Sequence, residues 1–287
     1  MRTCIAFLLL GSLAFAAPAE SDLDRAGQLY AHANFTAAAR LLDHGAAAHD
    51  PRSLALLGQC YYMLGEFKKA TETLEKASAA APSDSMVLTW LGRAWGMRAE
   101  SAFPLAAIGQ AGKSRDAFER ALRLDPSNNE ALGDLFDFYM AAPGMIGGGL
   151  DKAESLLPKY QQYDPVGYHI AKARIEEKKE RYPNAENSFR KAVEVVPHRV
   201  SLVLELAQYL HRRGRYDESE REFRHAAEIA PESPSVLYAR ANSYIAAHRN
   251  VEQARDLLKK YLASTNLTPD DPPRWEAQKL LRKAEVL

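Results

Sequence analysis

The glycine-rich stretch APGMIGGGLD, residues 142–151, is the first place where residue types and spacing suggest chemistry. A glycine-rich loop binds phosphate when a strand precedes it and Lys then Ser or Thr follows its last glycine. Here a helical pattern precedes the glycines, and Leu150 and Asp151 follow them. The Asp151 carboxylate would repel a phosphate. The glycines instead predict a tight irregular turn with positive backbone angles, and Asp151 is expected to cap the next helix.

Other catalytic and metal-binding patterns are absent from the sequence. The eight histidines include no pair at the three- or four-residue spacing that puts two metal ligands on one helix face, so we expect them in solvent or in turns. No serine lies in a strand-to-helix elbow, because the sequence has no convincing strands. Cys60 falls where a helix packs against its neighbours, which favours a core role over a nucleophile. We therefore expect no enzyme activity, no cofactor and no metal site.

Residues 1–19 have the layout of a secretory signal peptide. Arg2 precedes an apolar run from Ile5 to Phe15, and small residues follow it. The run is too short for a permanent membrane anchor, and an ordinary core helix would show an amphipathic period that this run lacks. No second apolar run of spanning length occurs, so the mature chain is expected to be exported, periplasmic or secreted, without an integral membrane segment. Only Cys60 would remain after cleavage, which leaves no internal disulfide.

The composition of the 287-residue chain is that of a folded protein that produces no strong long-range electrostatic field. Hydrophobic residues make up 47% and charged residues 26%, and 37 basic residues balance 37 acidic ones. A neutral chain has no long-range attraction for a polyanion, so nucleic acid is not an expected partner.

A repeat of about 34 residues organises the chain and would position any functional side chain. This offset relates Gly58 to Gly92, Phe189 to Phe223 and Pro197 to Pro231. In one unit, apolar residues at helical spacing form the face of a first helix, Gly65 ends it, a second apolar face follows and Pro82 stops the second helix. One such pair cannot bury both of its faces, so successive pairs must stack.

This pattern resembles the tetratricopeptide repeat. The resemblance implies an all-α solenoid of stacked antiparallel helix pairs, wound into a right-handed superhelix. It predicts about seven pairs over residues 20–264, and a linker with a C-terminal capping helix over residues 265–287, whose start Asp271 could cap. Two units are longer than the period, which puts insertions near residues 97–113 and 141–149, each between the two helices of a pair.

The two insertions should be neighbours because all within-pair turns of a solenoid lie along one edge. One hypothesis is structural: Phe103, Pro104, Leu105 and Ile108 pack against 145–146 and close a small satellite core. The other is functional: the paired loops narrow one end of the groove or contact a partner.

The resemblance also implies that the first helices line a concave groove that holds a segment of a protein or peptide partner. The predicted function is a non-enzymatic interaction scaffold. The alternative is a small-molecule-binding or catalytic protein with a pocket beneath the insertions, lined by Trp90 and Trp95. A third possibility, end-to-end self-association, is disfavoured by the polar C-terminal helix. The candidate groove residues are Gln59, Tyr62, Trp90, Arg93, Asp134, Asp137, Gln208, Arg212, Tyr238 and Asn242.

Overall fold

The computed structural model describes residues 21–44 and 50–287, and within these ranges all regular structure is helical. The signal peptide predicted for residues 1–19 lies outside the described residues. None of the described helices has both the length and the apolar character needed to cross a lipid bilayer.

The described helices stack as consecutive antiparallel pairs, each followed by the next along the chain, and this confirms the predicted all-α solenoid. The second element of the fourth pair is broken into a short 3-10 turn, η2, and two short helices. The elements are α1 (Asp22–Ala31), α2 (Phe35–Leu42), α3 (Pro51–Met63), α4 (Phe67–Ala80), α5 (Ser85–Ser101), α6 (Pro104–Leu124), α7 (Asn129–Ala141), η2 (Gly144–Ile146), α8 (Leu150–Ser155), α9 (Leu157–Tyr163), α10 (Pro165–Lys178), α11 (Tyr182–Val195), α12 (Val200–Arg212), α13 (Tyr216–Ile229), α14 (Pro234–Ala246), α15 (Val251–Ala263) and α16 (Arg274–Glu285).

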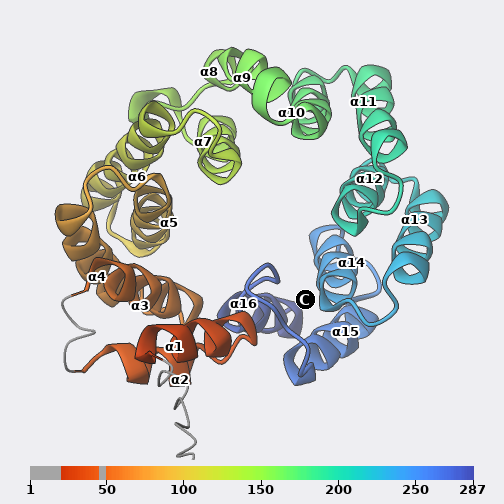
Figure 1. The fold of residues 1–287 in the computed structure, drawn as a ribbon. Helices are drawn as coiled ribbons and strands as arrows, with labels where there is room; N and C mark the ends of the chain where they lie inside the picture. The colour runs from red at the N-terminus through yellow and green to blue at the C-terminus, as the bar shows by residue number, and fades with distance from the viewer. Residues whose placement is uncertain (1–20, 45–49) are drawn as a thin grey trace, which may run out of the picture.

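The pairs follow one another around a ring (Figure 1). The first helices of the pairs, such as α5, α7, α12 and α14, face the inside, and the second helices, such as α6, α11 and α13, form the outer layer. The last helix, α16, lies within the ring beside the first pairs. The concave side of the solenoid therefore surrounds a central space.

The apolar core is a chain of local clusters, each shared by neighbouring pairs. Small residues let the two helices of a pair approach closely: a Cβ atom added at Gly58 would lie 2.5 Å from the Leu74 side chain. The same relation joins Gly92 to Phe118, also at 2.5 Å. Each cluster depends on the pair next to it, as expected for a solenoid.

Five within-pair turns use one backbone device. The second residue after the end of the first helix adopts a left-handed conformation, with φ of +78° at Gly65, +74° at Gly214, +60° at Glu180, +52° at Ala33 and +53° at His248. Glycine adopts this conformation without steric cost, whereas a Cβ atom opposes it. The turns at Ala33, Glu180 and His248 are therefore held under strain by the packing of the helices on either side.

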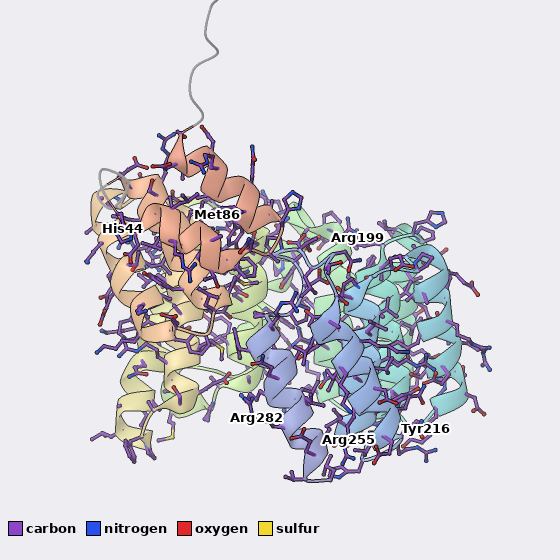
Figure 2. All side chains as sticks on the ribbon, turned by 90° about the horizontal axis from the view of Figure 1, so that it is seen from below. His44, Met86, Arg199, Tyr216, Arg255 and Arg282 are labelled. Atoms are coloured by element: carbon purple, nitrogen blue, oxygen red, sulfur yellow. The ribbon has the colours of Figure 1, made fainter. Side chains whose placement is uncertain are left out.

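The turns within a pair and the turns between successive pairs lie on opposite sides of the array, as Figure 2 shows. Met86 and Arg199, at the starts of first helices, lie toward the upper side, whereas Tyr216, at the start of a second helix, lies toward the lower side.

The insertion near residues 97–113 is helical, because it lengthens α5 to Ser101 and starts α6 at Pro104. The hypothesis that the two insertions pack into a small satellite core was wrong. Phe103 is 89% exposed, Leu105 87% and Met145 84%. These side chains therefore face solvent and do not form a shared core.

The insertion at residues 141–149 forms the tight glycine turn that the sequence predicted. Gly147 and Gly149 have φ of +92° and +138°, and a Cβ atom at Gly148 would lie 1.9 Å from the Ala142 carbonyl oxygen. The predicted cap was wrong, because Gly149 occupies the N-cap of α8 without a side-chain hydrogen bond. Asp151 instead lies in the first turn of α8, where an acid interacts favourably with the helix dipole.

The C-terminal helix does more than cover α15, because it also contacts the first pairs of the chain. The Trp275 ring lies edge-on to Phe67, with centroids 5.1 Å apart, and it covers Gly65 at the α3–α4 turn. Lys279 on α16 lies 3.6 Å from Glu100 at the end of α5. The solenoid thereby closes on itself.

The sequence predicted that Asp271 caps the start of α16, and this prediction was wrong. Pro273 occupies the N-cap position. The Asp271 carboxylate accepts hydrogen bonds from Thr268 and from Ser235 of α14, so it fixes the linker against the last pair.

We expect Glu180→Gly to raise the free energy of unfolding by about 1 kcal/mol, because glycine adopts the left-handed conformation without strain. The greater flexibility of glycine in the unfolded chain offsets part of this gain. The measurement is the urea midpoint followed by circular dichroism. Glu180→Ala is the matched control: it removes the same charge but keeps the Cβ atom, so its midpoint should stay near that of the wild type. Equal midpoints for the two variants would contradict the strained turn.

Trp275→Ala should open the ring, because the aromatic contact that joins α16 to the α3–α4 turn is lost. We expect a larger radius of gyration in small-angle X-ray scattering, with helical content preserved. Gln278→Ala, at an exposed position of the same helix, should leave the radius unchanged. If Trp275→Ala has the wild-type radius, closure does not depend on this contact.

Candidate functional site

The ten residues predicted to face the groove all lie on first helices of the pairs. They come from α3, α5, α7, α12 and α14, the layer that lines the inside of the ring in Figure 1. The structure thus brings them to one side of the solenoid, and their role in binding stays a prediction. Their members by helix are Gln59 and Tyr62, Trp90 and Arg93, Asp134 and Asp137, Gln208 and Arg212, and Tyr238 and Asn242.

The aromatic residues at the N-terminal end of the face pack on one another and are not free. Tyr62 and Trp90 are in edge-to-face contact, with ring centroids 5.4 Å apart. The Arg93 guanidinium lies over the Trp90 ring, 4.6 Å from its centroid, and Trp90 is only 9% exposed. This stack joins α3 to α5 and offers little aromatic surface to a partner.

Arg93 also joins α5 to α7. It lies 2.6 Å from the Asp134 carboxylate and 2.9 Å from that of Glu130. Burial raises the pKa of Asp134 to about 6, although the Arg93 charge and hydrogen bond act in the opposite direction. Asp134 is therefore held in the ion pair at the expense of its hydration.

The same kind of pair recurs farther along the ring. Arg174 of α10 lies 2.5 Å from Asp137 of α7. Arg212 of α12 binds Glu177 of α10 with two hydrogen bonds, of 3.0 and 2.8 Å. All four of the predicted charged residues are thus engaged in linking adjacent first helices.

A polar contact also fixes α16 to α14. The Tyr238 hydroxyl donates to the Glu276 carboxylate at 2.9 Å. Burial is the largest of several causes that raise the pKa of Tyr238, and the Glu276 charge adds to it, so the phenol stays neutral and remains a donor.

Three predicted residues keep their polar groups available. Among the described residues, the side-chain amides of Gln59, Gln208 and Asn242 have no hydrogen-bond partner. Gln208 and Asn242 line a cavity of about 840 Å³ on the inside of the ring, to which α7, α10, α12, α14 and α16 all contribute. They also line a cavity of about 480 Å³ between α12 and α14.

A smaller cavity of about 270 Å³ lies where α7, α10 and α12 meet. Phe136, Ile170 and Leu202 give it apolar walls, and Glu205 lines both this cavity and the cavity of about 840 Å³. The neighbouring first helices are joined here by long side chains, such as Arg174 and Arg212, which leaves room between the backbones.

Sequence reasoning missed four residues of the concave face: Arg174, Glu177, Glu205 and Glu276. The repeat offset of 34 residues leads from Asn242 through Gln208 to Arg174, so the signal for Arg174 was present. No periodic signal could reveal Glu276, because its place on the face follows from the position of α16 inside the ring.

The residues examined for catalysis are mostly structural. Cys60 is fully buried, as predicted, and burial raises the pKa of its thiol to about 12. The expectation of solvent or turn histidines was wrong for His211, which is 4% exposed and packs edge-on to Tyr216. Burial lowers its pKa. The described part of the chain contains no cluster of His, Cys, Asp and Glu that could hold a metal ion.

The pocket beside the first insertion differs from the one proposed in the alternative function. It has a volume of about 570 Å³ and is lined by the α3–α4 turn together with Arg98, Ser101 and Gln110. Neither Trp90 nor Trp95 lines it. The Trp95 ring is instead covered by Arg98 and Lys113, at 4.5 and 4.0 Å from its centroid.

Comparison with known proteins identifies the repeat. Two segments, residues 19–93 and 170–234, match family models described as tetratricopeptide repeat. No curated protein matches the sequence of the chain.

Solved structures share the fold at low sequence identity. A tetratricopeptide repeat protein from Parabacteroides merdae is 15% identical with a TM-score of 0.59, over 92% of this chain and 97% of that one. The protein TTC0263 from Thermus thermophilus is 22% identical with a TM-score of 0.52, over 69% of this chain and 96% of that one. A human IFIT1 dimer, solved with PPP-AAAA, is 17% identical with a TM-score of 0.55, over 84% of this chain and 54% of that one.

The Arg212–Glu177 pair should contribute little to stability, because the two side chains are 45% and 20% exposed. In a double-mutant cycle with Arg212→Ala and Glu177→Ala, we expect a coupling energy of about 0.5 to 1 kcal/mol from urea unfolding. A control cycle of Arg212→Ala with Lys159→Ala, a distant exposed residue, should give no coupling. A coupling energy several times larger would show that the pair is a fixed structural link.

Proposed function

The chain belongs to the tetratricopeptide repeat family, and we propose that it is a non-enzymatic scaffold that binds a segment of a partner protein on its concave face. The observation that carries the proposal is the pair of unpartnered amides, Gln208 and Asn242, on a cavity of about 840 Å³ inside the ring. Each amide can both donate and accept a hydrogen bond, so the two together suit the backbone of an extended peptide.

The ion pairs around these amides also fit a binding role. Pairs such as Arg212–Glu177 are partly exposed, so a partner can replace one contact with another at a small cost in free energy. Arginine and carboxylate groups held beside the amides offer charged contacts on either side of a bound segment.

A protein segment suits this face better than a nucleic acid. The human IFIT1 structure was solved with PPP-AAAA. Here, Arg93, Arg174 and Arg212 are each neutralised by a carboxylate, and the chain as a whole has no net charge. A polyanion would have to displace those acids without help from a long-range field.

The proposal includes export to the periplasm or the secreted space. Arg2, the apolar run over residues 5–15 and the small residues after it support a signal peptide. Cys60 is the one cysteine after that segment and lies buried, so the mature protein holds together by packing alone, without a disulfide.

The test is a selection of peptides from a random display library against the purified protein, followed by fluorescence anisotropy with the labelled peptides. We expect the double variant Gln208→Ala and Asn242→Ala to weaken binding by roughly tenfold, since two hydrogen bonds of about 1 kcal/mol each are lost.

The matched control changes two exposed residues of the outer helix α11, Lys191→Ala and Glu194→Ala, and should bind as the wild type does. Peptides that bind the Gln208→Ala and Asn242→Ala double variant as tightly as the wild type would place the binding surface elsewhere. Failure to select any peptide would count against a peptide-binding scaffold.

A further inference from the structure

Glu205 of α12 is the one concave carboxylate at the junction of α7, α10 and α12 that the described residues leave without a hydrogen bond or an ion pair. It lines both the cavity of about 270 Å³ and the central cavity of about 840 Å³. A charged group that is mostly buried without a partner is costly, so its presence points to a group that binds there.

The acids around Glu205 already have partners. Asp137 pairs with Arg174, and Glu177 is bound by both arms of Arg212. Asp164 accepts the backbone N–H of Gly167 at the start of α10. Arg174 and Arg212, whose charges act on Glu205, therefore each pair with another acid.

The charges of the smaller cavity leave an excess of one negative charge. Its lining contains three carboxylates, from Asp137, Asp164 and Glu205, and two guanidinium groups, from Arg174 and Arg199. Burial raises the pKa of Glu205, and the charges of Arg174 and Arg212 oppose this without cancelling it. A further cation would complete the site.

The walls of the same cavity fit an alkyl chain. Val166 and Ile170 are half-buried apolar residues of its lining, and Phe136 and Leu202 are buried apolar residues of the same wall. Gly133 also lines the cavity, and a Cβ atom placed there would meet nothing within 4 Å. Lysine and arginine have this form, an apolar stem that ends in a cation.

From this arrangement we infer that the cavity between α7, α10 and α12 binds a lysine or arginine side chain of the partner segment, with its cation on Glu205 and its stem against Val166 and Ile170. The inference rests on the proposed function, since it names the kind of segment that the concave face recognises. It predicts a partner with a basic residue beside the part of its backbone that reaches Gln208.

The direct test uses three blocked peptides, acetyl-Ala-Lys-Ala-amide, acetyl-Ala-Arg-Ala-amide and acetyl-Ala-Gln-Ala-amide, titrated into the full protein and followed by NMR. We expect the two basic peptides to bind and the glutamine peptide to bind at least roughly tenfold more weakly, as expected when a charge-assisted hydrogen bond is lost. Equal binding of all three peptides, or binding of none, would overturn the inference.

Glu205→Gln keeps the shape of the side chain and removes its charge, so it should lose roughly tenfold in affinity for the basic peptides. Glu194→Gln, on the outer helix α11, is the control and should bind as the wild type does. Because Glu205→Gln removes a buried unpartnered charge, its urea midpoint should equal or exceed that of the wild type. A lower midpoint would assign Glu205 to the fold, and wild-type affinity in this variant would reject its role in binding.

The library-selected peptides separate this inference from the proposed function. Some selected peptides could depend on Gln208 and Asn242 and yet lack a basic residue, or bind Glu205→Gln as they bind the wild type. Either result would contradict the inference about Glu205 and would still support the proposed scaffold function. If no selected peptide binds the concave face, the proposed function fails, and the blocked peptides still decide whether Glu205 holds a basic side chain.

Discussion

Each helix pair of this protein buries its apolar faces against the pairs beside it in the sequence. A single pair of helices is too small to cover its own apolar faces, so each pair is stable only against the next. The core accordingly runs as local clusters around the ring, with alanine and glycine at the closest approaches, as where Gly58 meets Leu74. The strained turns at Glu180 and His248 persist because this packing fixes the helices on both sides of them.

Closure adds a long-range contact to this local scheme. Phe67 and Trp275 are about 200 residues apart in the sequence, yet their rings touch. The contact joins the two ends of the solenoid, and Glu276 of the same helix lies on the concave face, bound to Tyr238 of α14. A binding segment would thus meet the C-terminal helix as well as the repeats, and the geometry of the site depends on both ends of the chain.

The concave face is defined by which polar groups are already satisfied. Ion pairs between adjacent first helices engage Arg93, Arg174 and Arg212, while Gln208 and Glu205 remain open to the central cavity. Residue type alone would rank the arginines first as binding residues. The ion pairs of the folded ring reverse that order. A mostly buried polar group without a partner gains the most binding free energy from a ligand, because its hydrogen-bonding capacity is otherwise unsatisfied.

The amino-acid pattern predicts the helix pairs, their stacking and the glycine turn at 147–149, because these features follow from periodicity and backbone preference over short distances. It also placed Gln208 and Asn242 on the inner helices. The folded ring was needed to reveal its closure, the exposure of Phe103, the missing caps at Asp151 and Asp271, the burial of His211 and the isolation of Glu205. These depend on small rotations that accumulate from pair to pair, and on contacts between side chains of different repeats, neither of which a local pattern encodes.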